Sequence, residues 1–130
     1  MTNEAEVYFA LVGAFDPRSL SLGIAPTDTR LKADPVPKHS WWIYSTGKVR
    51  SEVVDVYEMA STIVKALEPH TEKIKEAKDR LSLEAVLEVV LILSQDDEAS
   101  TPAIGFEPHI ISFLEKVGAS IDVDTYLSER

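Results

Sequence analysis

The residues best suited to chemistry in this chain lie between positions 27 and 45. This stretch combines hydroxyl groups, a cation and two adjacent tryptophans, and the candidate ligand- or partner-binding residues are Thr27, Arg30, Trp41, Trp42 and Ser45. Neighbouring residues of a strand point to opposite faces, so only one of the two tryptophans can lie in the core, and either assignment is open. The other can stack on a planar ligand beside Arg30 or anchor a protein partner. The structural alternative is a tryptophan that packs the proline-rich loop against the sheet.

Carboxylates offer a second kind of chemistry. Asp122 and Asp124 point the same way on a predicted strand and can share a proton or a cation. Charges at such positions also keep a sheet edge from pairing with another chain. The run Asp96-Asp97-Glu98 lacks the alternating positions and the glycine of a calcium loop, so it indicates a solvated turn. No histidine has a second histidine at helical spacing. We therefore expect no metal site and no cofactor.

Motifs that would indicate catalysis are missing from the sequence. The five glycines form neither a G-x-G-x-x-G fingerprint nor a Walker loop. There is no G-x-S-x-G motif, and the chain has no cysteine, which excludes thiol nucleophiles and disulfides. These observations favour a non-catalytic protein.

The charge is acidic and unevenly distributed. The net charge is −9; residues 1–50 carry six Lys/Arg against five Asp/Glu, whereas residues 51–130 carry seven against seventeen. Such a field repels phosphate backbones and anionic lipid, so we expect no nucleic-acid or membrane partner, and it favours a basic protein partner. The acidic N-terminus is unlike a secretory signal, no apolar stretch is long enough to span a membrane, and the lack of cysteine fits a reducing compartment. The expected location is the cytoplasm.

The pattern of apolar residues predicts one α+β domain over residues 1–130. Strands are expected at 7–15, 39–45, 82–94, 103–106 and 119–126, and the two main helices at 51–67 and 107–117, with a charged segment continuing over 71–80. Ser51 is expected to cap the first helix. From residue 39 onward this order is the ferredoxin-like split βαβ arrangement, with both helices on one face of an antiparallel sheet. The strand at 7–15 is an addition, and its two apolar faces indicate an interior position.

Several short motifs together resemble a known family. They are Tyr8-Phe9-Ala10-Leu11 with Gly13 and Phe15-Asp16-Pro17, Leu22-Gly23-Ile24 with Pro26-Thr27, Trp42 with Ser45, and the stretch Gly118-Ala119-Ser120-Ile121-Asp122-Val123-Asp124-Thr125-Tyr126. Their order and spacing are similar to the bacterial family catalogued as domain of unknown function 4279, over nearly the whole chain. One departure is Ala33-Asp34-Pro35, which stands where a glycine-containing segment is expected. The resemblance implies a compact single-domain bacterial protein and no reaction.

Three functions are compatible with these observations. The leading hypothesis is a non-catalytic protein-binding module, immunity-like or regulatory, that binds a basic partner. The alternative is a small-ligand sensor or enzyme with a pocket between the proline-rich loop 26–38 and the aromatic strand 39–45, in which Arg30 or Arg18 is buried. A homodimer formed through the exposed tryptophan is the third.

Overall fold

A single mixed sheet is the framework of the protein. The computed structural model describes residues 2–96 and 101–129, and within them the sheet has six strands. Their order is β2-β3-β1-β5-β6, and β4 pairs with the N-terminal end of β1. The strands are β1 (Asn3–Gly13), β2 (Asp28–Arg30), β3 (Ser40–Ser45), β4 (Val49–Ser51), β5 (Glu84–Leu93) and β6 (Ser120–Leu127).

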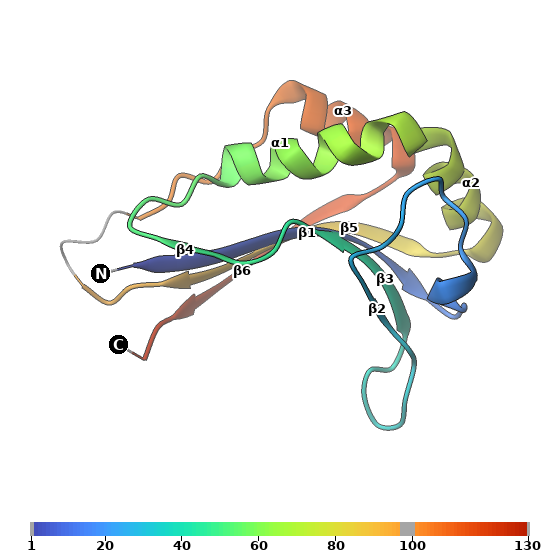
Figure 1. Ribbon diagram of the computed structural model, residues 1–130, viewed down its shortest axis with the longest axis horizontal. Helices are drawn as coiled ribbons and strands as arrows, with labels where there is room; N and C mark the ends of the chain where they lie inside the picture. The colour runs from blue at the N-terminus through green and yellow to red at the C-terminus, as the bar shows by residue number, and fades with distance from the viewer. Residues whose placement is uncertain (1, 97–100, 130) are drawn as a thin grey trace.

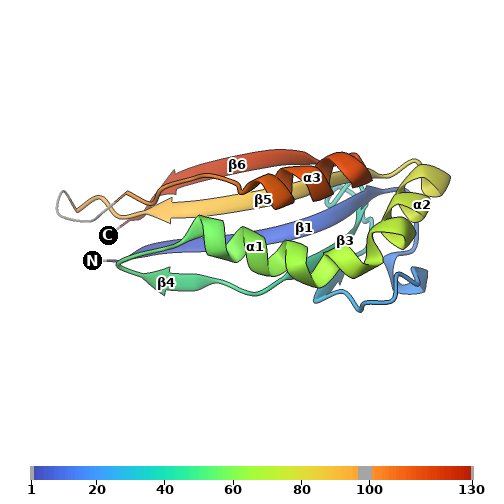
Figure 2. The ribbon, with the colours of Figure 1, turned by 90° about the horizontal axis from the view of Figure 1, so that it is seen from above.

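The helices cover one face of this sheet, as Figures 1 and 2 show. They are α1 (Val56–Leu67), α2 (Thr71–Leu81) and α3 (Pro108–Val117), with short 3-10 turns at Pro17–Ser19 and Glu68–His70. Seen from above, α3 lies over β5 and β6, whereas α1 follows β1 (Figure 2). Among the described residues, no helix is both long and apolar enough to cross a membrane.

The core fills the space between the helices and the sheet. Alternate residues of β1 and β5 point toward the helices and are fully buried, among them Val7, Phe9 and Leu87. Phe9 meets Phe113 of α3 edge to face, with 5.8 Å between ring centroids. The predicted interior position of the first strand is confirmed, because β1 pairs with β3 on one side and β5 on the other.

The predicted α+β class, with the helices on one face, is confirmed. Strands β4 and β5 both pair with β1, so the connection through α1 and α2 joins two strands that are separated by a third, as in a split βαβ unit. The sheet is not antiparallel throughout, however, because β5 and β6 run parallel. A parallel pair needs a crossover connection, and α3 provides it.

Three local predictions differ from the structure. Residues 103–106 form no strand, although Ala103 to Phe106 is apolar enough to suggest one. The short strand β2 lies inside the loop expected at 26–38, where prolines on both sides hide it. Helix α1 begins after Asp55 rather than Ser51, because Ser51 belongs to β4. The acidic turn predicted at residues 96–98 lies largely outside the described residues, which stop at Asp96 before the gap.

The capping of α1 provides a test of this boundary. The Asp55 carboxylate accepts a hydrogen bond from the Glu58 backbone N–H at 3.1 Å. Replacing such a cap with alanine typically costs about 1 kcal/mol, so Asp55→Ala is expected to lower the free energy of unfolding by about that amount. Ser51→Ala is the matched control and is expected to cost less than about 0.5 kcal/mol. Urea denaturation of both variants measures the difference, and equal losses would contradict this helix start.

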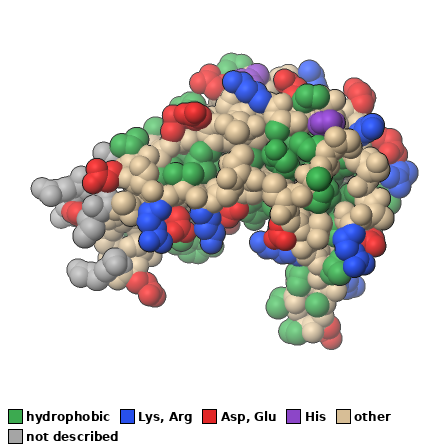
Figure 3. All heavy atoms as spheres, viewed as in Figure 1, with side chains coloured by type: hydrophobic (Ala, Val, Ile, Leu, Met, Phe, Trp, Pro, Cys, Tyr) green, Lys and Arg blue, Asp and Glu red, His purple; other side chains and the backbone are tan. Residues whose placement is uncertain are grey.

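The face of the sheet opposite the helices is uncovered. In Figure 1 the strands arch, so that β6 at one end and the β2–β3 hairpin at the other extend away from the helices. The space-filling view in Figure 3 shows the molecule hollowed beneath this arch. Side chains that point away from the helices therefore line a concave surface, which we call the open face. It is formed by alternate residues of the strands, among them Tyr8, Trp41, Glu88 and Asp122.

Candidate functional site

A row of polar side chains crosses the middle of the open face. Strand register places Ser45 of β3 opposite Tyr8 of β1, Tyr8 opposite Glu88 of β5, and Glu88 beside Asp122 of β6. Asp124 lies two residues further along β6 and therefore on the same face. Four strands thus bring together residues that are distant in the sequence.

Three carboxylates gather at the β6 end of this row. Glu88, Asp122 and Asp124 each have a carboxylate oxygen within 4.8 Å of the other two, and we call them the carboxylate cluster. Glu88 is only 6% exposed, and its Oε1 atom has no hydrogen-bond partner among the described residues. Asp124 is half-buried and Asp122 is exposed. The cluster therefore opens to solvent on the β6 side and is closed at its base by Glu88.

The environment of Glu88 favours its neutral form. Burial raises the pKa of this carboxyl group to about 8, and hydrogen bonding with Asp124 and Asp122, together with their negative charge, acts in the same direction. At neutral pH, Glu88 therefore holds a proton that it can donate to a neighbouring carboxylate. A cation placed among the three groups would reverse this balance, because it stabilises the ionised form.

Tyr8 lies on the open face between the carboxylate cluster and the hollow that it lines with Arg30. Burial raises the pKa of its phenol, the nearby Glu88 raises it further, and Arg30 opposes this effect. The hydroxyl thus remains protonated across the physiological range, and it can serve as a hydrogen-bond donor between an acidic and a basic region.

The structure settles which tryptophan is buried. Trp42 lies opposite Leu11 in the core and is fully buried, so it cannot contact a ligand at the surface; its Nε1 atom has no hydrogen-bond partner among the described residues. Trp41 lies on the open face, half-buried, and the Arg30 guanidinium is 5.8 Å from its ring centroid. This arrangement is a cation–π contact.

The two predicted hydroxyl residues hold the β2–β3 hairpin together. The Thr27 hydroxyl donates to the Ile43 carbonyl at 3.2 Å and accepts from the Ser45 N–H at 2.8 Å. The Ser45 hydroxyl donates to the Glu6 carboxylate at 2.7 Å. Thr27, Arg30 and Ser45 line a hollow of about 330 Å³ together with Glu6 and Tyr8, among others. The structure thus brings these three predicted residues together, with Trp41 beside Arg30, and places Trp42 elsewhere.

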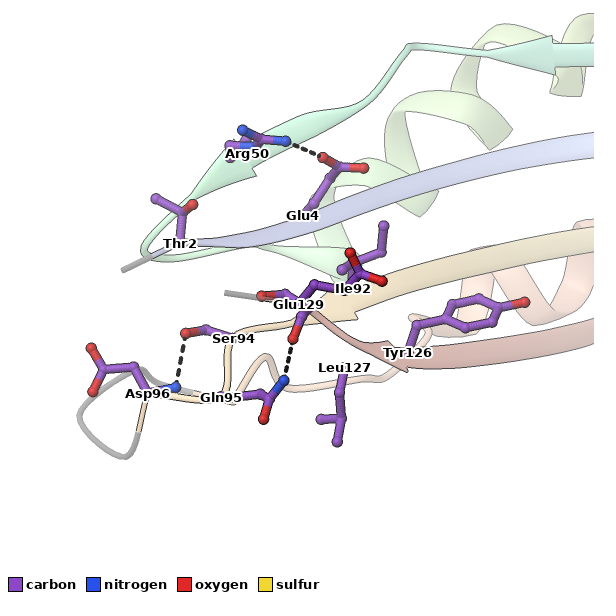
Figure 4. Close-up of a pocket in the computed structure, with 11 residues that line it drawn as sticks. Thr2, Glu4, Arg50, Ile92, Ser94, Gln95, Asp96, Tyr126, Leu127 and Glu129 are labelled. Carbon is purple, nitrogen blue, oxygen red and sulfur yellow. Dashed lines mark hydrogen bonds and ion pairs between the residues drawn. The ribbon is translucent and has the colours of Figure 1, made fainter.

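A larger hollow, of about 1030 Å³, lies where β1 begins and where β5 and β6 end (Figure 4). Its walls include Glu4, Ile92 and Tyr126. Arg50 of β4 lies opposite Glu4 of β1 and forms a 2.9 Å ion pair with it. The Gln95 amide donates to the Ser128 carbonyl at the outer rim. This end of the open face is therefore bordered by interactions between strand ends.

Comparison with known proteins now identifies the family. The model of a family described as "Domain of unknown function (DUF4279)" matches residues 3–128. The chain belongs to this family. No curated protein and no solved structure matches it.

The match to DUF4279 confirms the resemblance noted in the sequence and extends over every strand of the sheet. The carboxylate cluster and the hollow beside Arg30 both lie within the matched residues. The family description assigns no activity, so the chemistry of this DUF4279 chain must be inferred from its own side chains.

Sequence reasoning found two members of the carboxylate cluster and missed the third. Asp122 and Asp124 were predicted to share a face, and they do. Glu88 was not connected with them, because strand order is needed to place β5 beside β6. One signal was present: Glu88 stands between Val86 and Val90 on the same face of an interior strand, where a charged residue is uncommon.

The carboxylate cluster has the chemistry of a cation receptor. Within the part of the chain that the structure describes, no lysine or arginine forms an ion pair with Glu88, Asp122 or Asp124. Carboxylate oxygens suit the guanidinium group of arginine, the ammonium group of lysine and hard divalent metal ions.

Proposed function

We propose that this protein is a non-catalytic binding module, immunity-like or regulatory and cytoplasmic, which recognises a basic protein partner on the open face of its sheet. The observation that carries this proposal is the carboxylate cluster, in which Glu88 is buried without a counter-charge. A lysine or arginine side chain of the partner would enter between the three carboxylates and supply that charge.

The wider charge distribution supports a basic partner. The chain has a net charge of −9, so its field attracts cationic molecules from a distance and accelerates their encounter. Glu6 and Glu84 add carboxylates to the same face as the cluster. The face is concave and free of helices, which leaves room for a protein segment (Figure 3).

A specific observation favours a small ligand as the second candidate function. The Arg30 side chain is about half exposed at 53%, and its ion pair with Asp28 is long, at 3.9 Å. The guanidinium group can therefore turn toward an anionic or planar ligand in the hollow that it shares with Tyr8 and Ser45. Arg18 does not contribute to this hollow, since its guanidinium pairs with Asp16 at 3.1 Å.

A direct test measures the binding of a fluorescent oligo-arginine peptide at low salt. Asp122→Asn/Asp124→Asn is expected to weaken binding about fivefold, because each exposed ion pair contributes up to about 1 kcal/mol. The matched control is Glu72→Gln/Glu115→Gln, which removes the same charge from exposed positions on α2 and α3. This control is expected to change the dissociation constant less than about twofold.

Two results would contradict the proposal. Equal weakening by both variant pairs would mean that only net charge attracts the peptide, without a specific site. Binding that is unchanged in Asp122→Asn/Asp124→Asn would mean that the peptide does not contact the carboxylate cluster.

A further inference from the structure

We infer that the basic partner binds by adding an extended strand to the free edge of β6. This inference rests on the proposed function, and it specifies how the partner is recognised. The partner strand would pair its backbone with β6 and carry lysine or arginine at alternate positions, with apolar residues between them.

β6 is a long strand with one side open. It pairs in parallel with β5 over its whole length, from Ser120 to Leu127. Among the described residues no strand pairs with its outer side, and Figure 2 shows it at the margin of the sheet. The opposite edge strand, β2, has three residues against eight in β6. An exposed edge of this length presents a row of backbone donors and acceptors to an incoming chain.

The two faces of β6 differ in chemistry. Asp122 and Asp124 point to the open face, beside Glu88. Ile121 and Val123 point toward the helices, and they are 39% and 38% exposed at the margin of the core. The edge therefore offers charge on one side of the sheet and incompletely covered apolar surface on the other.

A paired strand would complement both faces at once. Side chains of adjacent strands that face each other directly have Cβ atoms about 5 Å apart, and successive residues alternate between the faces. Basic side chains on the open face would thus meet Asp122 and Asp124 and reach the buried Glu88. The intervening apolar side chains would cover Ile121 and Val123, which removes apolar surface from water.

The same charges oppose pairing of β6 with a second copy of this chain. An antiparallel pair centred on Val123 would place Asp122 directly opposite Asp124 of the second copy. Like charges in this position destabilise a strand pair. The edge is therefore protected against self-association and remains open to a basic strand, which is why we choose the basic strand as the occupant.

The test uses synthetic peptides as long as β6. In the first, arginine and valine alternate; in the second, the same residues form one block of arginine and one of valine. Two further peptides repeat the first with N-methylated backbone amides at alternate residues, so that one is methylated along one edge of the strand and the other along the opposite edge. We expect the alternating peptide to bind at least about fivefold more tightly than the block peptide. Methylation on the edge that faces β6 should abolish binding, whereas methylation on the other edge should not. Amide hydrogen exchange should show new protection along β6.

A variant of the chain itself gives an independent check. Val123→Thr keeps the shape and strand preference of valine but reduces its apolar surface, and is expected to weaken binding of the alternating peptide about threefold. Val53→Thr, at a position 75% exposed and outside β6, is the control and should leave binding unchanged.

The outcomes separate this inference from the proposed function. If methylated and block peptides bind as well as the alternating one, yet Asp122→Asn/Asp124→Asn still weakens them, strand addition is wrong and the basic partner stands. If no basic peptide binds, the proposed function fails as well. If exchange protection of β6 appears without peptide and depends on protein concentration, a second copy occupies the edge and the inference is overturned.

Discussion

Glu88→Gln is expected to abolish most of the pH dependence of stability between pH 5 and pH 8. The pKa of Glu88 is about 8 in the folded protein, against an ordinary value of 4.5. In this range the unfolded chain releases the proton while the folded protein retains it. The wild-type free energy of unfolding therefore falls as pH rises, by at most about 5 kcal/mol over the whole range. Glutamine resembles the protonated carboxyl group and does not titrate, so the variant lacks this fall.

The measurement is urea denaturation of both proteins at several pH values from 5 to 9. The variants should be similarly stable at pH 5, and Glu88→Gln should be the more stable by several kcal/mol at pH 9. Glu84→Gln is the matched control, because Glu84 lies on the same face of β5 but is exposed. Asp16 and Asp79 have lowered pKa values and so affect stability below this range. If wild type and Glu88→Gln give parallel curves, the buried neutral carboxyl group is not present.

The fold was predictable from the sequence wherever local patterns carry the information. The apolar runs at 7–15 and 82–94 indicated β1 and β5, and the helix expected at 107–117 is α3, which ends before Gly118 with its positive φ of 69°. Strand direction was less accessible. The composition of Ala103 to Phe106 suggests a strand, and a strand there would reverse the chain once more before β6. In the structure these residues form no strand, so α3 alone connects β5 to β6 and the two strands run parallel.

The candidate site was predictable only in its parts. Alternation showed that Trp41 and Trp42 face opposite ways, but only the pairing of Trp42 with Leu11 assigns it to the core. In the same way, the alternation of the last strand predicts that Asp122 and Asp124 share a face. Their proximity to Glu88 can be predicted only when the pairing of β5 with β6 is known. Residues 88 and 122 are brought together by tertiary structure, and nothing in their local sequence connects them.

Binding of a basic peptide should tighten about tenfold between pH 7 and pH 9. With a pKa of about 8, Glu88 is about nine-tenths protonated at pH 7, and a guanidinium group in the carboxylate cluster favours the ionised form. Binding at pH 7 must therefore release a proton, and this cost disappears as the pH passes the pKa. The groups that face Glu88 are Asp122, Asp124 and Tyr8, and the phenol does not interfere, because its pKa is raised above 10.0.

Calorimetry in buffers of different ionisation enthalpy measures this proton directly. An arginine peptide is the suitable probe, since arginine does not titrate below pH 9. The wild-type protein should release close to one proton per peptide at pH 7 and almost none at pH 9, while Glu88→Gln should release none at either. The same calorimetry with magnesium or calcium chloride in place of the peptide tests whether the cluster binds a divalent metal ion instead. Release of the same proton at millimolar metal would assign the carboxylate cluster to a divalent ion. A peptide that binds without proton release would show that its cation stays outside the cluster, and recognition would then depend on the exposed carboxylates of β6 alone.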